Sequence, residues 1–220
     1  MNMPDADGLL LADKAYLKLR ELLTREGLRA GQFVSMPDLV RMLGFPLAPT
    51  REAVKRAETV ALVEVVPKRG VMVMEATPER IRECFDLRAI LDQEGARRIV
   101  RHHDPSLLDA LRAHHERVLA QAREGITPAL QHEAKEVDWE LHQALAAALE
   151  NPAAEAVYAL NRDKIAVIQH SRPLLPDRIV PAMEEHLRII DAISDGDEDL
   201  AAGAVRDHYR HTLRWWGIFV

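Results

Sequence analysis

Four side chains in the second half of the sequence could together bind a metal ion: Asp138, His142, His186 and His208. Asp138 and His142 lie four residues apart, so on a helix both project from one face. His186 and His208 each fall within an apolar stripe of a later helical segment. Three imidazoles and a carboxylate would be costly to bury unpaired, and one shared divalent ion, of zinc, nickel, manganese or iron, would satisfy all four.

The Asp138–His142 pair carries little information by itself, because an aspartate and a histidine one turn apart more often form a surface hydrogen bond. The other seven histidines do not share the placement of His186 and His208, and we expect them at the surface or at helix ends. They are His102, His103, His114, His115, His132, His170 and His211. Of these, His211 is the nearest competitor for the role of His208.

Arg88 is a second unusual residue, because it falls on the inward stripe that Ile81, Phe85 and Leu91 define. An arginine in that position needs an anion or several hydrogen-bond acceptors. Asp92, one turn further along, could be its partner within the chain. An anionic ligand from outside the chain is the alternative.

Helices must position all of these side chains. From Pro78 onward the apolar residues keep a helical period, which is broken only at short segments such as His103–Pro105 and Asn151–Pro152. Thr77 is expected to cap the first of these helices, with Pro78 as its first residue. The predicted helices span roughly 78–102, 105–124, 128–150, 152–171, 178–194 and 197–216.

The first part of the chain has a different pattern. Three shorter helical segments, 13–27, 36–43 and about 48–60, are joined by tight turns, as in a helix-turn-helix. Two β-branched runs follow, Leu62–Val66 and Val71–Met74, and the turn-forming residues between them predict a hairpin.

We therefore expect a mainly α chain of two domains. Residues 1–75 would form a winged helix-turn-helix of three helices plus a β-hairpin wing, and residues 76–220 an all-α bundle of six to seven helices.

Composition limits the class of protein. A chain of 220 residues that is 48% hydrophobic can bury a core in each of two domains. Its single cysteine, Cys84, excludes an intramolecular disulfide and a cysteine-based zinc site. No apolar stretch is long enough to cross a bilayer and the N-terminus has no signal-peptide pattern, so we expect a cytoplasmic protein without a membrane partner.

Charge is distributed unevenly along the chain. The formal net charge of −6 argues against a protein that coats nucleic acid through bulk positive charge. Residues 1–75 carry 11 Lys and Arg against 10 Asp and Glu, whereas residues 76–220 carry 18 against 25. The balance therefore permits a DNA-binding surface in the first domain without demonstrating one.

A resemblance to the GntR family of bacterial transcription regulators lies in LGFPLAPTREAVKRAETVALVEVVPKRGVMV. The matching positions are Leu43, Gly44, Pro49, Arg51, Glu52, Ala53, Leu62, Val63, Arg69, Gly70 and Val73. Further on, FDLRAIL, the pair Asp138 and His142, the tripeptide ENP, the run EHLRIIDAI and the late His208 are similar to the FadR-type (FCD) C-terminal domain. The resemblance covers nearly the whole chain.

The resemblance implies a function and a set of roles. It implies that the chain is a homodimer that binds a pseudo-palindromic site on double-stranded DNA, and that Asp138, His142, His186 and His208 hold a divalent metal ion. It also implies that Arg88 and the metal hold a small organic acid as effector. The identity of the effector, the metal, and the choice between repression and activation do not follow from it.

For DNA contact the resemblance and the charges together favour five residues: Arg51, Lys55, Lys68, Arg69 and Gly70. The family pattern has Ser-Arg at the start of its recognition helix, and this sequence has Pro46-Leu47 there. An arginine in that place can donate two hydrogen bonds to guanine, and a leucine cannot. The operator should therefore differ from the family's usual one. The alternative is that Arg51, Lys55 and Arg56 form an ordinary solvated helix face.

The sequence thus predicts a ligand-responsive, DNA-binding transcription regulator that is not an enzyme. Two other interpretations stay open. One is a helical metal-dependent enzyme whose site activates water. The other is a former regulator with impaired DNA binding, which Pro46 and Leu47 would explain.

Overall fold

The structure is a computed structural model that describes residues 9–25, 27–102, 105–171 and 176–219. Its residues form two compact units, Met1–Arg80 with Arg162–Arg172, and Ile81–Asn161 with Pro173–Val220. We call them the N-terminal unit and the helical unit. Within the described ranges no helix combines the length and the apolar character that crossing a membrane requires.

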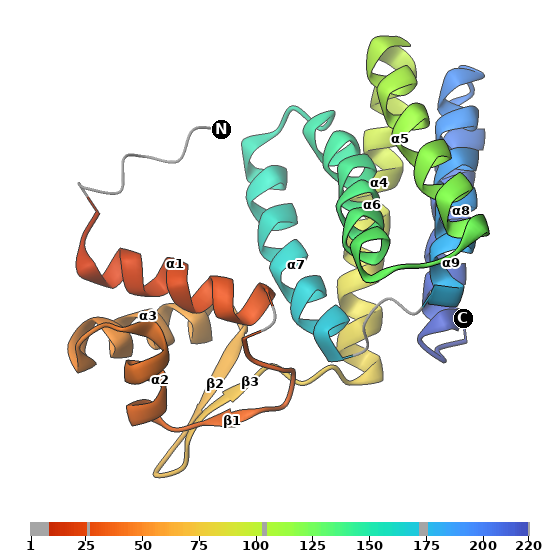
Figure 1. Ribbon diagram of the computed structural model, residues 1–220. Coiled ribbons are helices and arrows are strands. Elements are labelled where there is room, and N and C mark those ends of the chain that lie inside the picture. Colours follow the sequence, from red (N-terminus) through yellow and green to blue (C-terminus); the bar gives the residue numbers. More distant parts are fainter. Residues whose placement is uncertain (1–8, 26, 103–104, 172–175, 220) are drawn as a thin grey trace. The chain divides into compact units, whose positions relative to one another are not determined.

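The N-terminal unit contains the predicted three helices and hairpin (Figure 1). Its elements are α1 (Leu11–Thr24), β1 (Phe33–Val34), α2 (Met36–Leu43), α3 (Leu47–Thr59), β2 (Val63–Val66) and β3 (Gly70–Val73). The strand β1 was not predicted, because two residues are too short to show an alternating pattern. The winged helix-turn-helix expected from the sequence is confirmed.

The turn between α2 and α3 follows from local chemistry. The Ser35 hydroxyl accepts a hydrogen bond from the Asp38 N–H and caps α2, and Gly44, at φ +73°, ends it in the left-handed conformation. α3 begins after Pro46 without a side-chain cap. The helix forms all the same, because the N–H groups that prolines lack in a first turn have no partner within a helix.

The sheet has the order β1-β3-β2, and both pairs are antiparallel. Gly70, at the start of β3, has φ +124°, a region that side chains rarely adopt. A Cβ atom there would lie 2.6 Å from the Val34 carbonyl oxygen of β1. Glycine is therefore required at position 70 because the backbone of β3 comes very close to that of β1 there.

The six helices predicted for the rest of the chain are present, with ends within three residues of the expected ones. They are α4 (Pro78–His102), α5 (Pro105–Glu124), α6 (Pro128–Ala147), α7 (Pro152–Ser171), α8 (Pro176–Ser194) and α9 (Glu198–Trp215). They form the helical unit, except that residues 78–80 of α4 and 162–171 of α7 are grouped with the N-terminal unit. The Arg80 N–H donates to the Thr77 hydroxyl at 3.3 Å, which is the predicted cap of α4.

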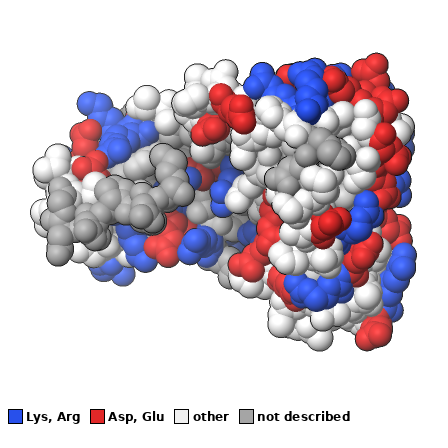
Figure 2. Space-filling model, turned by 90° about the horizontal axis from the view of Figure 1, so that it is seen from above, with Lys and Arg blue, Asp and Glu red and all other residues white. Residues whose placement is uncertain are grey.

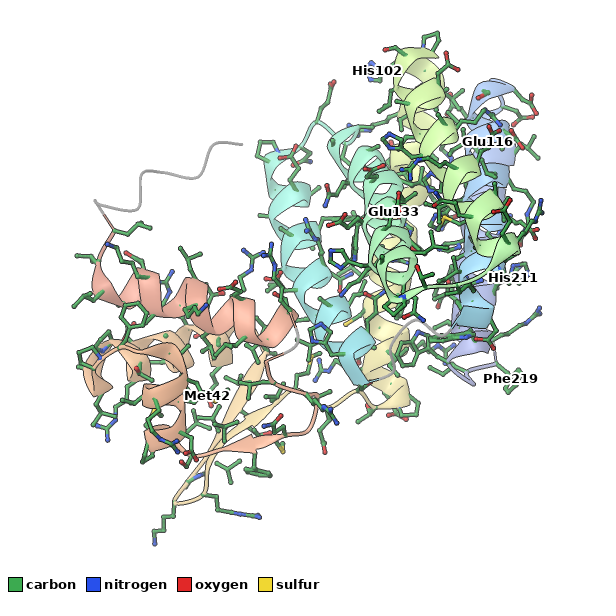
Figure 3. The ribbon with its side chains drawn as sticks, viewed as in Figure 1. Met42, His102, Glu116, Glu133, His211 and Phe219 are labelled. Atoms are coloured by element: carbon green, nitrogen blue, oxygen red, sulfur yellow. The ribbon has the colours of Figure 1, made fainter. Side chains whose placement is uncertain are left out.

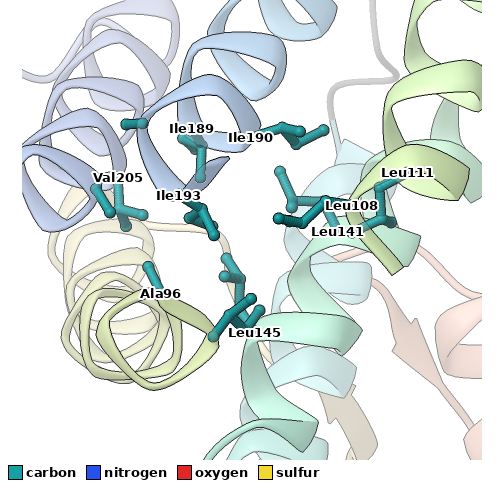
Figure 4. Close-up of a cluster of buried hydrophobic side chains, with 12 residues drawn as sticks. Ala96, Leu108, Leu111, Leu141, Leu145, Ile189, Ile190, Ile193 and Val205 are labelled. Atoms are coloured by element: carbon teal, nitrogen blue, oxygen red, sulfur yellow. The ribbon is translucent and has the colours of Figure 1, made fainter. Parts of the chain in front are cut away.

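One apolar cluster packs the centre of the helical unit (Figure 4). Its buried members come from five helices and include Ala96, Leu111, Leu141, Leu145, Ile189, Ile190 and Val205. Gly95 on α4 lies against this cluster, and a Cβ atom on it would be 2.1 Å from the Leu145 carbonyl oxygen of α6. α4 and α6 can approach this closely only because residue 95 has no side chain.

Candidate metal centre

Three of the four predicted metal ligands meet inside the helical unit. His142 on α6, His186 on α8 and His208 on α9 each offer one ring nitrogen, and these nitrogens lie within 4.8 Å of one another. All three side chains are buried, at 0%, 0% and 4% exposure. Leu141 of the apolar cluster directly precedes His142, and Ile189 follows His186 by about one helical turn, so the packing of Figure 4 also positions the imidazoles.

Each imidazole is held from behind through its Nδ1 atom. His142 Nδ1 lies 2.8 Å from Asp92 Oδ2, and His208 Nδ1 lies 2.8 Å from Glu185 Oε2. Carboxylates of this kind accept the Nδ1–H proton and fix both the tautomer and the ring orientation. The Nε2 atoms of His142 and His208 then carry lone pairs.

The Nε2 atoms of His142, His186 and His208 are buried and have no hydrogen-bond partner among the described residues. Unpaired buried polar atoms are rare in folded proteins and call for an explanation. Three imidazole nitrogens that converge in this way are a donor set that divalent transition metals favour. The residues present therefore fit a metal ion.

Burial keeps the three imidazoles in their neutral form, which can bind a cation. Burial lowers the pKa of His142 and His186 well below the ordinary value of 6.5, and it also lowers the pKa of His208. The imidazoles are therefore neutral at neutral pH. Neutral imidazole is the form that coordinates a metal, so protons compete for these nitrogens only in acid.

Two buried carboxylates support the ligands, and their own surroundings differ. Burial raises the pKa of Glu185, but hydrogen bonds with His208 and Arg178 outweigh it and hold the pKa at about 2. Arg178 grips Glu185 with two hydrogen bonds of 2.8 and 2.6 Å. For Asp92, burial prevails over the opposing effect of Arg88 and raises the pKa to about 7. Its second oxygen accepts a hydrogen bond of 2.9 Å from the Tyr158 hydroxyl.

Asp138, the fourth predicted ligand, lies at the edge of the cluster. Its Oδ1 atom is 3.6 Å from His186 Nε2, and its side chain is 13% exposed. Asp138 precedes His142 by one turn of α6 and projects toward the same centre, as the i, i+4 spacing predicted. The structure thus gathers the three histidines and places this carboxylate beside them.

Arg88 is buried, at 4% exposure, on the inward face of α4. Its guanidinium lies over the rings of Phe85 and Trp139, 4.9 and 5.9 Å from their centroids. The ion pair with Asp92 is present but long, 3.8 Å between Nε and Oδ2. His142 and Tyr158 hold the Asp92 oxygens at shorter distances, so Asp92 satisfies Arg88 only in part.

The prediction that His115 lies at the surface or at a helix end is wrong. His115 is in the middle of α5 with 0% exposure, and its Nε2 atom is 3.1 Å from His186 Nδ1. The signal was available, because His115 continues the apolar stripe of Leu111, Val118 and Leu119, as His186 and His208 do in their helices.

The other histidines do not join the cluster. His102, His114 and His132 are exposed, as expected, and His211 is half-exposed and lies 3.3 Å from Glu185 Oε1. Figure 3 labels His102 at the end of α4 and His211 on α9. His170 is half-buried near the end of α7, and His103 lies outside the described residues.

The residues predicted to contact DNA lie on two elements of the N-terminal unit. Arg51 and Lys55 are exposed on α3, where with Leu47, Ala48 and Glu52 they line a shallow open hollow. Buried Thr50, Ala53, Val54 and Ala57 form the opposite face of this helix.

The wing presents two further cations. Lys68 and Arg69 are exposed in the turn between β2 and β3, and the Arg69 guanidinium lies 4.9 Å from the ring centroid of Phe33. Arg56 is different, because it pairs with Asp13 at 2.6 Å and lies over Tyr16, both on α1. Among the described residues, Arg51 and Lys55 have no ion pair, and these are the two cations of α3 that the sequence favoured.

Comparisons with known proteins agree with this architecture. The model of the FCD domain family matches residues 83–211. An HTH-type transcriptional regulator in an unstable DNA locus of Streptomyces ambofaciens is 27% identical over 198 residues, 89% of this chain and 80% of that protein.

Solved structures share the fold. A Rhodococcus sp. RHA1 protein described as a GntR transcriptional regulator has a TM-score of 0.76 at 18% identity, over 95% of this chain and 99% of that one. McbR/YncC of E. coli has a TM-score of 0.71 at 16% identity, over 94% and 97%.

Proposed function

The chain belongs to the FCD-domain family and is a transcription regulator of the GntR type, and from this premise we propose a metal-dependent, ligand-responsive regulator that binds DNA as a homodimer. The observation that carries the proposal is a cluster of three buried histidines whose Nε2 atoms have no hydrogen-bond partner among the described residues. A regulator has no structural need for such a cluster unless something binds there, because unpaired buried polar atoms destabilise the fold.

His142, His186 and His208 would hold the metal through Nε2, and the Asp138 carboxylate would complete the set. Three nitrogens and one oxygen suit zinc, nickel, manganese or iron, and four protein ligands leave room for a ligand oxygen where the ion takes five or six. When bound, the metal supplies a positive charge that attracts a carboxylate oxygen. Arg88 adds a second positive charge, which Asp92 neutralises only in part.

The proposed effector is therefore a small carboxylate held between Arg88 and the metal. A guanidinium can hold a carboxylate with two parallel hydrogen bonds, and its position over Phe85 and Trp139 fixes its plane. An anion at this place would change the equilibrium between conformations with different DNA affinity, provided that it binds one of them more tightly.

Small organic acids should raise the thermal midpoint of the metal-loaded protein, whereas sugars and amines should not. At about 100 times its dissociation constant, a ligand adds about 2.7 kcal/mol of stability, which corresponds to roughly 5–10 °C for a chain of this size. The rise should vanish in Arg88→Gln and in metal-stripped protein, and persist in Arg82→Gln, an exposed arginine of the same helix. Stabilisation by neutral or cationic compounds alone would contradict a carboxylate effector and would leave Arg88 only its ion pair with Asp92.

The proposed DNA contacts come from the exposed face of α3 and from the wing. Two winged helices related by a two-fold axis would read a pseudo-palindromic operator, with half-sites separated by whole helical turns. Leu47, exposed in the first turn of α3, would meet the bases where the family pattern has an arginine. Selection of genomic fragments by the purified protein, with and without metal, tests this proposal, and failure to select any fragment contradicts it.

Arg51→Ala should abolish most specific DNA binding. A bidentate contact from arginine to a base is worth about 1–3 kcal/mol, so the loss of two copies in a dimer should weaken operator binding at least about 30-fold. Arg56→Ala is the matched control, because Arg56 is on the same helix but pairs with α1. Fluorescence anisotropy with the selected operator measures both. Equal operator affinity of Arg51→Ala and wild type would show that Arg51 does not contribute to DNA binding.

A further inference from the structure

His115 is connected to the candidate metal centre without belonging to the ligand cluster. Its ring lies edge-on to that of His186, with centroids 5.2 Å apart, and its side chain is fully buried. Its two nitrogens have one partner each, the Leu111 carbonyl oxygen and His186 Nδ1. Both partners are fixed within packed helices, so each ring nitrogen has a defined role.

The direction of these hydrogen bonds follows from the Leu111 carbonyl, which has no proton to donate. His115 Nδ1, 2.7 Å from that oxygen, must therefore carry the proton and donate it. In neutral His115 the Nε2 atom then carries no proton and has a lone pair. It accepts a hydrogen bond from His186 Nδ1–H over 3.1 Å.

With its proton on Nδ1, neutral His186 keeps a lone pair on its buried Nε2 atom, and the ring lies in the same cluster as His142 and His208. We propose that His115 is a positioning residue that fixes the tautomer and the ring orientation of His186, so that His186 Nε2 is available to a metal ion. The inference rests on the proposed metal site.

This support differs from the other two in charge. Carboxylates hold His142 and His208, whereas a neutral imidazole holds His186. A third carboxylate at this place would cancel more of the positive charge of the metal and of Arg88. A neutral support leaves the site more attractive to an anionic effector.

The test compares variants of residue 115 by their affinity for zinc, measured in competition with a chromophoric chelator. His115→Phe keeps the buried ring but has no acceptor for His186 Nδ1–H, and loss of such a support costs about 10–100-fold in metal affinity. His115→Gln should recover much of that loss, because its amide oxygen can accept this proton while its NH₂ group donates to Leu111. His114→Ala, at the exposed neighbouring position, should bind zinc like the wild type.

Thermal melting of the metal-free variants separates misfolding from loss of affinity. Wild-type zinc affinity in a folded His115→Phe variant would overturn the inference, as would equal losses in the Phe and Gln variants. Long-range ¹H–¹⁵N NMR of the metal-free wild type measures the tautomer of His186 directly, without any substitution. It should show the His186 proton on Nδ1, and a proton on Nε2 would refute the inference. If instead the wild type binds none of zinc, nickel, manganese and iron, the proposed metal site fails before this inference is reached.

Discussion

Replacing His186 and His208 together by alanine should leave the protein without stoichiometric metal. The double variant retains only His142 Nε2 and the Asp138 carboxylate, which are two of the four proposed ligands and come from a single helix. Zinc sites in proteins need three or four protein ligands, so the remaining pair should not hold an ion through purification. Elemental analysis of protein prepared without a chelator or a histidine tag gives the metal content per chain.

The matched control is His114→Ala with His132→Ala, which removes two exposed histidines. It should keep one metal ion per chain, and circular dichroism should show that both double variants remain helical. A full complement of metal in His186→Ala/His208→Ala would place the site elsewhere in the molecule.

Gly95→Ala should be among the most damaging single-methyl additions in the chain. The new Cβ atom would lie 2.1 Å from the Leu145 carbonyl oxygen, a backbone atom that moves only if α4 and α6 separate. Overpacking of this kind costs about 1–3 kcal/mol, and a clash with backbone belongs at the upper end. We expect a thermal midpoint lower by roughly 6–12 °C.

The same substitution should weaken metal binding. Asp92 lies one turn before Gly95 on α4, and His142 lies one turn before Leu145 on α6. Separation of the two helices would therefore lengthen the 2.8 Å contact between Asp92 and His142. A chelator competition assay would detect the change.

Gly203→Ala is the control for Gly95→Ala, because among the described residues a Cβ atom there meets only the flexible end of Arg206, at 3.7 Å. Within α9 the change from glycine to alanine should stabilise the helix by about 0.5–1 kcal/mol. A thermal midpoint for Gly95→Ala equal to or above that of the wild type would show that the two helices can adjust without cost.

The sequence predicted the helices well because their apolar residues keep a regular period and because prolines and glycines mark their ends. Thr77 before Pro78 even predicted the first residue of α4. The strand β1 was missed, since Phe33 and Val34 are recognisable as a strand only when β3 pairs with them. Pairing between distant segments is not visible in a local pattern.

The candidate metal centre was predictable in part, because a local pattern shows which residues share a helix face but not which helices meet. Spacing placed Asp138 and His142 on one face of a helix, and apolar stripes in two later helices singled out His186 and His208, the same four residues to which the family resemblance assigns a metal. The supports of these ligands were not predicted, because Asp92 and Glu185 resemble ordinary charged residues until the fold brings them to the imidazoles. His115 was misjudged although its position in an apolar stripe was readable.

The face of the molecule that Figure 2 shows gives no direct indication of a binding surface. On the face that Figure 2 shows, acidic and basic side chains are intermixed. Four buried charged residues, Arg88, Asp92, Arg178 and Glu185, are more informative, because they lie around the three imidazoles. Burial of charge is costly, so a buried group of this size indicates a specific role.

The hydrogen bonds around the imidazoles draw on every helix from α4 to α9. Asp92 comes from α4, His115 from α5, His142 from α6, Tyr158 from α7, Glu185 and His186 from α8, and His208 from α9. A fragment that lacks one of these helices cannot assemble the whole network. Metal occupancy would therefore report the folding cooperativity of the whole bundle, and amide hydrogen exchange in all six helices should slow together when the ion binds.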